Sequence, residues 1–319
     1  MLRVMELYND IPVKVGISAT MKDWNSLAYQ LRKVSNQGFA SDVSRFDSSV
    51  PIVFLEEVTA VFNAIYTHCS LPGELIDEGN RIREVLHRAI EGALVIGKKA
   101  VFKLDQAQVS GNPATALENS FIMWALYYLV WKKLAAEHSP HMATYKAFRE
   151  NVYLAIYGDD NICTVSPQCP WFNFNTFAKA ALDYGFLITD AKKRGGVIPD
   201  FQPLEEMDFL KRSFRQEQNL WCGPLDIQSI GKSLCWIRDS AYNIKREHVP
   251  NLGGSWPTSD NADLISASIT AMWPEIALHG RETYQRWVDH LVPQFGELGI
   301  SAIPPRWEQA MAVYDYTVY

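Results

Sequence analysis

The sequence lacks the patterns that mark secreted, membrane-spanning or zinc-binding proteins. Its five cysteines are an odd number at irregular spacing, with no Cys-x-x-Cys pair and no His-rich neighbour, which favours reduced thiols over a disulfide framework and does not support zinc. No run approaches the roughly 18 apolar residues of a membrane span. The first residues include acids and no long apolar core, so they do not predict a signal peptide. We expect a globular chain in a cytosolic setting.

An excess of basic residues is also missing. The chain has 30 Lys and Arg against 36 Asp and Glu, a formal net charge of -6, whereas proteins that coat nucleic acid carry a positive excess. Any nucleic-acid site must therefore be local. The 319 residues are 48% hydrophobic and 12% aromatic, without a low-complexity tract, which suffices for the core of one large domain or a few subdomains.

The most informative stretch is the sequence Tyr-Gly-Asp-Asp-Asn at positions 157–161. The apolar runs Val152–Ile156 and Ile162–Val165 flank it and favour strands, and Gly158 allows the positive φ of a tight hairpin turn. We expect this turn to present its two acids outside a buried sheet. Adjacent carboxylates repel each other unless a cation lies near them, so the turn predicts a divalent metal site.

A third acid comes earlier in the chain. Residues 38–43 are predicted to form a short buried strand that ends near Asp42. If this strand neighbours the hairpin, Asp42 converges with Asp159 and Asp160, as two-metal phosphoryl transfer requires, with ions about 3.5 to 4 Å apart. Oxygen ligands without His favour Mg²⁺ or Mn²⁺ over zinc. The alternative for each acid alone is a surface turn, where Asp is common.

The pattern elsewhere predicts helices more than strands. Ser48 and Ser49 followed by Pro51 indicate a helix start. Further helices are predicted at 74–94, from the segment after Pro113 to about residue 136, and from 227 onward, with strands within 98–109 and 207–214 and a basic turn at 188–196. The expected apolar faces of the first and third helices are Phe54, Val58, Val61, Phe62 and Ile65, and Leu117, Phe121, Trp124, Tyr128 and Trp131.

Five polar motifs follow one another along the chain, and their order resembles palm motifs A to E of viral RNA-dependent RNA polymerases. The similarity is greatest to the picorna-like group, including the dicistrovirus-like enzymes, and it extends from about residue 15 to the C-terminus. The motifs are Asp42 with Asp47; Ser110-Gly111 with Thr115 and Asn119; Tyr157-Gly158-Asp159-Asp160; a Lys-bearing turn; and Phe209-Leu210-Lys211-Arg212.

The resemblance implies an α+β right-hand fold. It would have an antiparallel palm sheet flanked by helices and a mostly helical thumb. The implied divisions are the start of the palm at 1–51, a partial fingers insertion at 52–108, the palm at 109–220 and the thumb at 221–319. Because only 41 residues precede Asp42, most of the N-terminal fingers would have to come from elsewhere in the same polyprotein, and we expect the chain alone to polymerise poorly.

The resemblance also implies the catalytic residues. Asp42 and Asp159 would be the principal ligands of two Mg²⁺ or Mn²⁺ ions, with Asp160 as an auxiliary acid. Lys193 would be the general acid that protonates the leaving pyrophosphate. Its neighbour Lys192 is an alternative for that role, and a solvated basic turn is an alternative for both.

Substrate-binding residues follow in the same way. Asp47 and Asn119 would sense the ribose 2′-hydroxyl, with Thr115 supporting them. By position alone, a cap or exposed surface is the favoured interpretation of this polar pair on the helix. The loop that adjusts template and nucleotide would contain Ser110 and Gly111, and the primer backbone would contact Lys211 and Arg212.

The implied function is RNA-directed RNA polymerase activity that replicates a positive-strand RNA virus genome. Its partners would be RNA template and primer, NTPs, the fingers segment and other viral replication proteins. It would act in the host cytoplasm at membrane-associated replication complexes without a membrane span of its own. One alternative is a reverse transcriptase-like polymerase, disfavoured because Asp47 is small where a bulky side chain is expected. The other is a non-catalytic RNA-binding remnant of palm and thumb.

Overall fold

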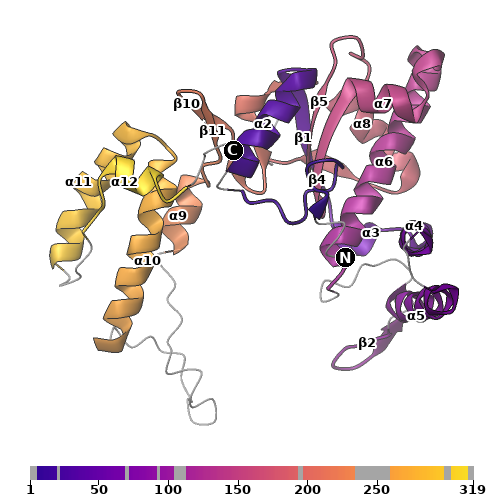
Figure 1. Cartoon of the computed structure of the whole chain (residues 1–319), viewed down its shortest axis with the longest axis horizontal. Helices are drawn as coiled ribbons and strands as arrows, with labels where there is room; N and C mark the ends of the chain where they lie inside the picture. The colour runs from indigo at the N-terminus through magenta and orange to yellow at the C-terminus, as the bar shows by residue number, and fades with distance from the viewer. Residues whose placement is uncertain are drawn as a thin grey trace. The chain divides into compact units, whose positions relative to one another are not determined.

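The computed structural model describes residues 6–19, 22–68, 72–91, 94–103, 113–192, 197–233, 259–297 and 303–314. The chain divides into two compact units. The first comprises residues 1–17 and 29–210, and the second comprises residues 18–28 and 211–319. Figure 1 shows the elements of each unit.

The first unit is built on a five-stranded antiparallel sheet in the spatial order β4-β5-β1-β6, with β7 pairing along the other end of β1. β1 lies at the centre because its apolar residues are buried on both faces. The strands are β1 Gln37–Val43, β4 Val152–Tyr157, β5 Asp160–Val165, β6 Ile188–Asp190 and β7 Gln202–Pro203.

Helices cover this sheet, and Figure 1 shows α6 and α8 beside it. A separate two-stranded ribbon follows α5, so the helix predicted at 74–94 ends sooner and the strand predicted within 98–109 has a partner. The elements are α2 Lys22–Val34, α3 Phe46–Ser49, α4 Ile52–Thr67, α5 Gly73–Glu91, β2 Leu94–Ile96, β3 Val101–Lys103, α6 Thr115–His138, α7 Tyr145–Asn151 and α8 Phe174–Ala181, with short 3-10 turns at Pro140–Met142, Leu182–Tyr184 and Leu204–Glu206.

Strand alternation decides which helices each side chain of the sheet faces. Phe39 of β1 packs against Tyr127 of α6 and Phe177 of α8, with ring centroids 6.1 and 5.5 Å away. On the opposite face of the sheet, the hydroxyl of Thr164 donates to the carbonyl of Leu31 in α2. Side chains at odd positions of β1 and β5 therefore face α6 and α8, and those at even positions face the other way.

Two details of the predicted helices were wrong. Ser48 and Ser49 lie inside α3, and α4 has Pro51 at its N-cap position without a side-chain cap. The prediction failed because the chain makes a separate four-residue helix before the proline. On α4, the residues Val61 and Ile65 are exposed, since only the side with Phe54, Val58 and Phe62 packs onto the core.

The second unit is mostly helical after its first strands, as predicted from residue 227 onward. Its core gathers Trp273 of α10 and Tyr284 of α11, whose rings meet edge to face. No helix among the described residues of either unit is both long enough and apolar enough to cross a membrane. The elements are β9 Arg212–Ser213, β10 Arg215–Glu217, β11 Leu220–Cys222, α9 Ile227–Ser233, α10 Ser259–Ala277, α11 Arg281–Glu297 and α12 Trp307–Met311.

The prediction of one strand at 207–214 also needs correction. β8 covers Asp208–Phe209, and β9 begins at Arg212. Between them, Leu210 and Lys211 both have positive φ, 54° and 58°, as in the two-residue turns that reverse a strand. Neither residue is a glycine, so the sequence gives no turn signal at this point.

Candidate active site

The acidic residues are brought together by strand register. β1 and β5 pair in the order Gly38↔Thr164 to Ser41↔Asn161, so the next position sets Asp42 across from Asp160. At the other side of β5, Asp160 pairs with Tyr157 of β4. Only two residues, Gly158 and Asp159, are left to connect the two strands. Strand pairing therefore places the three acids at one end of the sheet, and their joint role as metal ligands stays a prediction.

The hairpin turn has the predicted geometry at its first position. Gly158 has a φ of 66°, which a residue with a Cβ adopts only under strain. Asp159 is exposed at the second position, whereas Asp160 is only partly exposed as the first residue of β5. The expectation that both acids stand outside the sheet holds for Asp159 and needs correction for Asp160, because strand pairing draws that residue inward.

Asp160 is held in an environment that disfavours its charge. Burial raises its pKa to about 7, and the carboxylates of Asp159, Asp42 and Asp208 act in the same direction. The backbone N–H of Leu210 donates to its Oδ2 over 2.8 Å and partly offsets the rise. Burial is the larger cause of the shift, and the three neighbouring carboxylates add to it.

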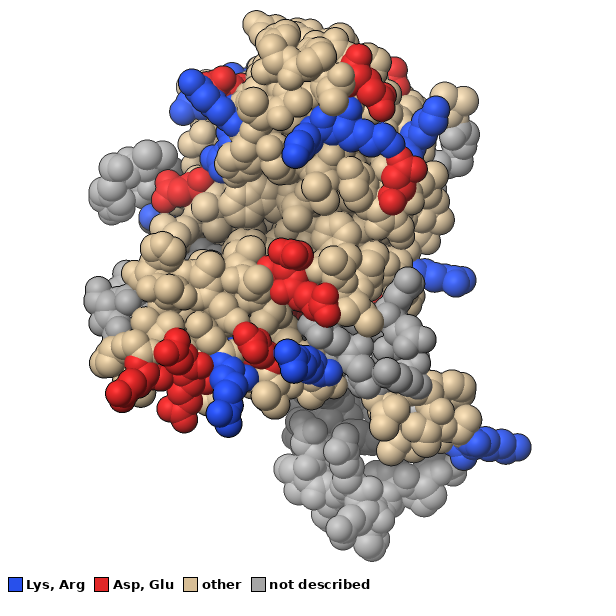
Figure 2. Space-filling view, turned by 90° about the vertical axis from the view of Figure 1, so that its right-hand side faces the viewer, with Lys and Arg blue, Asp and Glu red and all other residues tan. Residues whose placement is uncertain are grey.

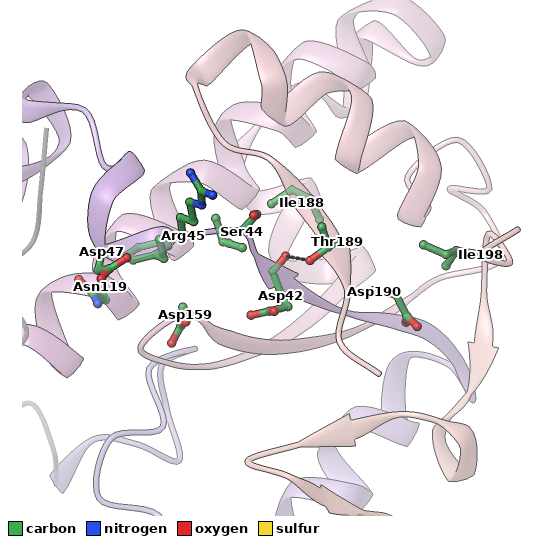
Figure 3. A pocket seen from close by; sticks show the side chains of 12 residues that line it. Asp42, Ser44, Arg45, Asp47, Asn119, Asp159, Ile188, Thr189, Asp190 and Ile198 are labelled. Carbon is green, nitrogen blue, oxygen red and sulfur yellow. Dashed lines mark hydrogen bonds between the residues drawn. The ribbon is translucent and has the colours of Figure 1, made fainter. Parts of the chain in front are cut away.

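A cavity of about 940 Å³ opens beside these acids. It is lined by Asp42, Asp47, Asn119 and Asp159, four of the predicted site residues, together with Asp190 of β6. Figure 3 shows Asp47 and Asn119 at one end of this cavity and Asp42 and Asp159 in its middle. Residues from β1, α3, α6 and the hairpin turn thus share one space.

Asn119 has an unusual environment in that cavity. The residue is 9% exposed, and among the described residues its Oδ1 has no hydrogen-bond partner. A buried carbonyl oxygen without a donor costs about 1–3 kcal/mol, so the position favours a ligand that supplies one. The alternative interpretation, a cap or exposed surface, does not fit this burial.

The donor set is compatible with a hard divalent cation. Asp42 and Asp159 supply carboxylate oxygens to the cavity, which are the donors that Mg²⁺ and Mn²⁺ prefer. Among the described residues, no group of three or more His, Cys, Asp and Glu side chains is arranged to hold a metal ion. Mg²⁺ is often bound by one or two carboxylates with water and substrate phosphates completing its shell, and the two aspartates suit that kind of site.

Several predicted residues lie outside the described part of the chain. Lys193, Ser110 and Gly111 belong to this group, so their roles stay predictions. The alternative general acid, Lys192, is described, and its Nζ lies 3.1 Å from Oδ1 of Asp208. Thr115 begins α6 one turn before Asn119, as expected from the spacing.

The two residues predicted to contact the primer differ in their surroundings. Lys211 is exposed in the turn before β9. The guanidinium of Arg212 donates to both carboxylate oxygens of Glu275, at 2.8 and 3.0 Å, and to the carbonyl of Gly223. Arg212 therefore has a structural partner, which favours Lys211 over Arg212 for the predicted primer contact; both contacts remain predictions.

Three further residues of the cavity have no counterpart in the sequence prediction. Thr189 of β6 pairs with Asp42 in the sheet, and its hydroxyl donates to the Asp42 carbonyl over 3.3 Å. Asp190 follows it, and Arg45 lies in the loop after β1 with a φ of 53°. A positive φ at a non-glycine residue outside a hairpin is a detectable signal of strain, but only in a structure.

Surface charge is mixed on the face that Figure 2 shows. On the face shown in Figure 2, Lys and Arg side chains are scattered among Asp and Glu and do not form one broad basic patch. This matches the net charge of -6.

Comparison with known families decides the class of the protein. The family model described as viral RNA-dependent RNA polymerase matches residues 3–294, which is most of the chain. The chain belongs to the viral RNA-dependent RNA polymerase family. The residues that line its acidic cavity lie within the matched range.

Individual relatives of this polymerase chain come from picorna-like viruses. The replicase polyprotein of Acute bee paralysis virus is 30% identical over 236 residues, covering 72% of this chain and 12% of the relative. That of Cricket paralysis virus is 27% identical over 320 residues, covering 96% and 16%. The RNA1 polyprotein of Cherry rasp leaf virus is 28% identical over 319 residues, covering 98% and 13%. The chain thus spans less than a fifth of these polyproteins.

A solved polymerase confirms the predicted α+β fold class. The Sicinivirus 3Dpol RNA dependent RNA polymerase superposes with a TM-score of 0.71 at 17% identity, covering 97% of this chain and 58% of that one. At this identity the likeness shows the fold. The polymerase fold and the resemblance to the picorna-like group are both confirmed.

Proposed function

We propose that this chain carries the palm active site of an RNA-directed RNA polymerase, which transfers nucleotides from NTPs to an RNA 3′-hydroxyl during replication of a positive-strand RNA virus genome. The whole enzyme would include segments beyond this chain, because relatives and the solved polymerase are longer. RNA template and primer, NTPs and other viral replication proteins would be its partners, at a replication site in the host cell. The division into palm, fingers insertion and thumb follows the boundaries expected from the motifs.

The observation that carries the proposal is the buried, unpartnered Oδ1 of Asn119 in the same cavity as Asp42 and Asp159. A ribose 2′-hydroxyl can donate to that oxygen and accept from an N–H group. Asp47, at the same end of the cavity, adds an acceptor. A site that leaves a buried acceptor without a partner discriminates strongly against a ligand that lacks the hydroxyl.

The acids have different roles in this proposal. Asp42 and Asp159 would hold two divalent cations, and Asp160 would support them from the strand behind. When bound, these ions lower the pKa of the primer hydroxyl and offset the charge on the leaving pyrophosphate. The hydroxyl of Thr189 fixes the backbone of Asp42, so that carboxylate is presented from a rigid strand. Lys193, or Lys192 beside it, would give a proton to pyrophosphate.

The reverse-transcriptase alternative makes a different prediction at the sugar. Such an enzyme would favour deoxyribonucleotides and would block the 2′-hydroxyl with a bulky side chain. In this chain the position is occupied by Asp47, which is exposed at the cavity. The geometry supports ribonucleotides.

Nucleotide binding by the 319-residue chain tests the proposal directly. In the presence of Mn²⁺, isothermal titration calorimetry should show GTP binding about tenfold more tightly than dGTP, as expected from one or two extra hydrogen bonds. Asn119→Leu should remove this preference, whereas Asn151→Leu at the end of α7, whose side-chain amide donates to the carbonyl of Ala147 in the same helix, should retain it. A wild-type chain with equal affinity for both nucleotides would contradict the ribose-sensing role.

The non-catalytic alternative needs a separate test. Asp159→Asn should abolish primer extension by the longer polyprotein product that contains this chain, and it should weaken Mn²⁺ binding to the chain itself. An unchanged rate of extension would show that the acidic cavity does not catalyse nucleotidyl transfer.

A further inference from the structure

Two backbone groups of the hairpin turn, one on Gly158 and one on Asp159, form hydrogen bonds with buried side chains. The N–H of Gly158 donates to the hydroxyl of Ser120 over 2.8 Å, and the carbonyl of Asp159 accepts from Nδ2 of Asn161 over 2.7 Å. Ser120 and Asn161 are both 0% exposed. The turn is therefore fixed from inside the protein while the Asp159 side chain remains at the cavity.

Asn161 of β5 also forms a hydrogen bond with β1, the strand that carries Asp42. Its Oδ1 accepts hydrogen bonds from the hydroxyl of Ser41 over 2.7 Å and from the hydroxyl of Tyr127 over 2.6 Å. Ser41 directly precedes Asp42 and pairs with Asn161 in the sheet. One buried amide thus connects the backbone of Asp159 to the residue beside Asp42.

Strand alternation explains how this network stays apart from the acids. Ser41 and Asn161 are at odd positions and face α6, whereas Asp42 and Asp160 are at even positions and face the opposite side. Ser120 approaches from α6, where its hydroxyl also donates to the carbonyl of Ala116 over 2.6 Å. Buried hydrogen bonds thus connect α6 with β5 and its turn, and β5 with β1, the strand that carries Asp42.

We propose that Ser120 and Asn161 are positioning residues of the active site: they lock the Gly158–Asp159 turn and the end of β1 in the relative placement that cation binding by Asp42 and Asp159 requires. This rests on the proposed role of those two acids. Groups that orient ligands from behind commonly change metal affinity by 10- to 100-fold when they are removed.

Energetics separates this role from ordinary core stability. A buried hydrogen bond removed anywhere in the sheet costs stability, so stability alone cannot identify a positioning residue. Thr164 provides the matched control because it lies on the same strand, is 0% exposed and donates one buried hydrogen bond, to Leu31 over 2.6 Å. It touches neither the turn nor the end of β1.

The experiment measures Mn²⁺ binding to the 319-residue chain by electron paramagnetic resonance, with unfolding in urea and hydrogen exchange of a peptide covering residues 152–165. Ser120→Ala and Asn161→Leu should each raise the Kd for Mn²⁺ about tenfold or more. Thr164→Val should lose stability with a Kd that stays within about twofold. In Ser120→Ala, the peptide containing Gly158 should also exchange faster, because that amide has lost its acceptor.

The outcomes distinguish this inference from the proposed function. If Asp159→Asn weakens Mn²⁺ binding but Ser120→Ala matches the Thr164→Val control, the positioning role is wrong and the cation site stands. Should Asp159→Asn leave Mn²⁺ binding unchanged, the cation site itself is wrong. Asn161→Leu removes the acceptor shared by two buried hydroxyls and could fail to fold, in which case Ser120→Ala, which deletes a single oxygen, decides the question.

Discussion

Gly38 of β1 lies directly against the backbone carbonyl of Cys163 in β5: a Cβ at Gly38 would sit 1.9 Å from that oxygen. The contact belongs to the strand pair that sets Asp42 opposite Asp160. No side chain can move to relieve it, because the clash is with backbone.

Gly38→Ala should therefore destabilise the first unit by at least about 2 kcal/mol, since overpacking at a rigid site forces the strands apart. Urea unfolding measures the loss. Gly73→Ala is the matched control, because a Cβ at the start of α5 meets nothing within 4 Å, and there alanine should be neutral or slightly stabilising. Equal stability of the two variants would show that β1 and β5 are not packed this closely.

The strained loop after β1 gives a second prediction. Arg45 has a φ of 53°, a conformation that costs a residue with a Cβ roughly 1–2 kcal/mol. Among the described residues that line the cavity, it is the only Lys or Arg, beside four aspartates. Arg45→Gly should stabilise the chain by about 1 kcal/mol and weaken binding of NTP, whose triphosphate it would contact.

The control for that prediction is Arg45→Lys, which keeps both the charge and the strain. It should leave stability unchanged and bind NTP better than the glycine variant does. Urea unfolding and calorimetric titration with GTP provide the two measurements. If glycine stabilises the chain with no loss of nucleotide affinity, then Arg45 does not contact the substrate.

Much of the first unit was predictable because its signals are local. The run of β-branched and aromatic residues around the Gly158 turn specifies two short strands, and the helix predicted to reach about residue 136 is α6. The order of acidic motifs then identified the family. These features depend on residues that are close in sequence, where spacing and turn chemistry are informative.

What could not be predicted depends on pairing between distant segments. Thr189 and Asp190 reach the cavity only because β6 pairs with β1, and no spacing in the sequence indicates that. In the sequence, Asn161 is only a polar residue within a predicted strand. Its role depends on the hydroxyls of Ser41 and Tyr127, which are distant in the chain and donate hydrogen bonds to it. The non-glycine turn at Leu210 likewise shows only in its dihedral angles.

A buried lysine should make stability depend on pH. Lys14 is 3% exposed, with its Nζ donating to the carbonyls of Tyr8 and Ile11, and burial lowers its pKa to about 8. Below pH 8 the folded and unfolded chains are both protonated here, and the cost of burying the charge is fully present. Between pH 8 and 10.5 the folded chain has lost the proton while the unfolded chain still binds it, so stability rises with pH.

Between pH 7.5 and 9.5, deprotonation of Lys14 in the folded chain should raise the free energy of unfolding by about 2 kcal/mol. Lys14→Met should lack that part of the pH dependence, and Lys146→Met, at an exposed position of α7, should retain it. Urea unfolding across this range is the measurement. Identical pH profiles for wild type and Lys14→Met would show that the amine is charged at all these pH values.

The adjacent residues Lys211 and Arg212 should separate affinity for RNA from stability. Lys211 is exposed, so Lys211→Gln should leave stability within about 0.5 kcal/mol and reduce the salt dependence of RNA binding by about one phosphate contact.

Arg212→Met removes the partner of Glu275, whose carboxylate accepts two hydrogen bonds from the guanidinium. Leaving a partly buried carboxylate without its cationic partner should cost about 2 kcal/mol, although the Tyr314 side chain still hydrogen-bonds to it, with little change in the salt slope. Fluorescence anisotropy with a short RNA at several salt concentrations, alongside urea unfolding, measures both quantities; a stable Arg212→Met variant with a reduced slope would instead place that guanidinium on the RNA backbone.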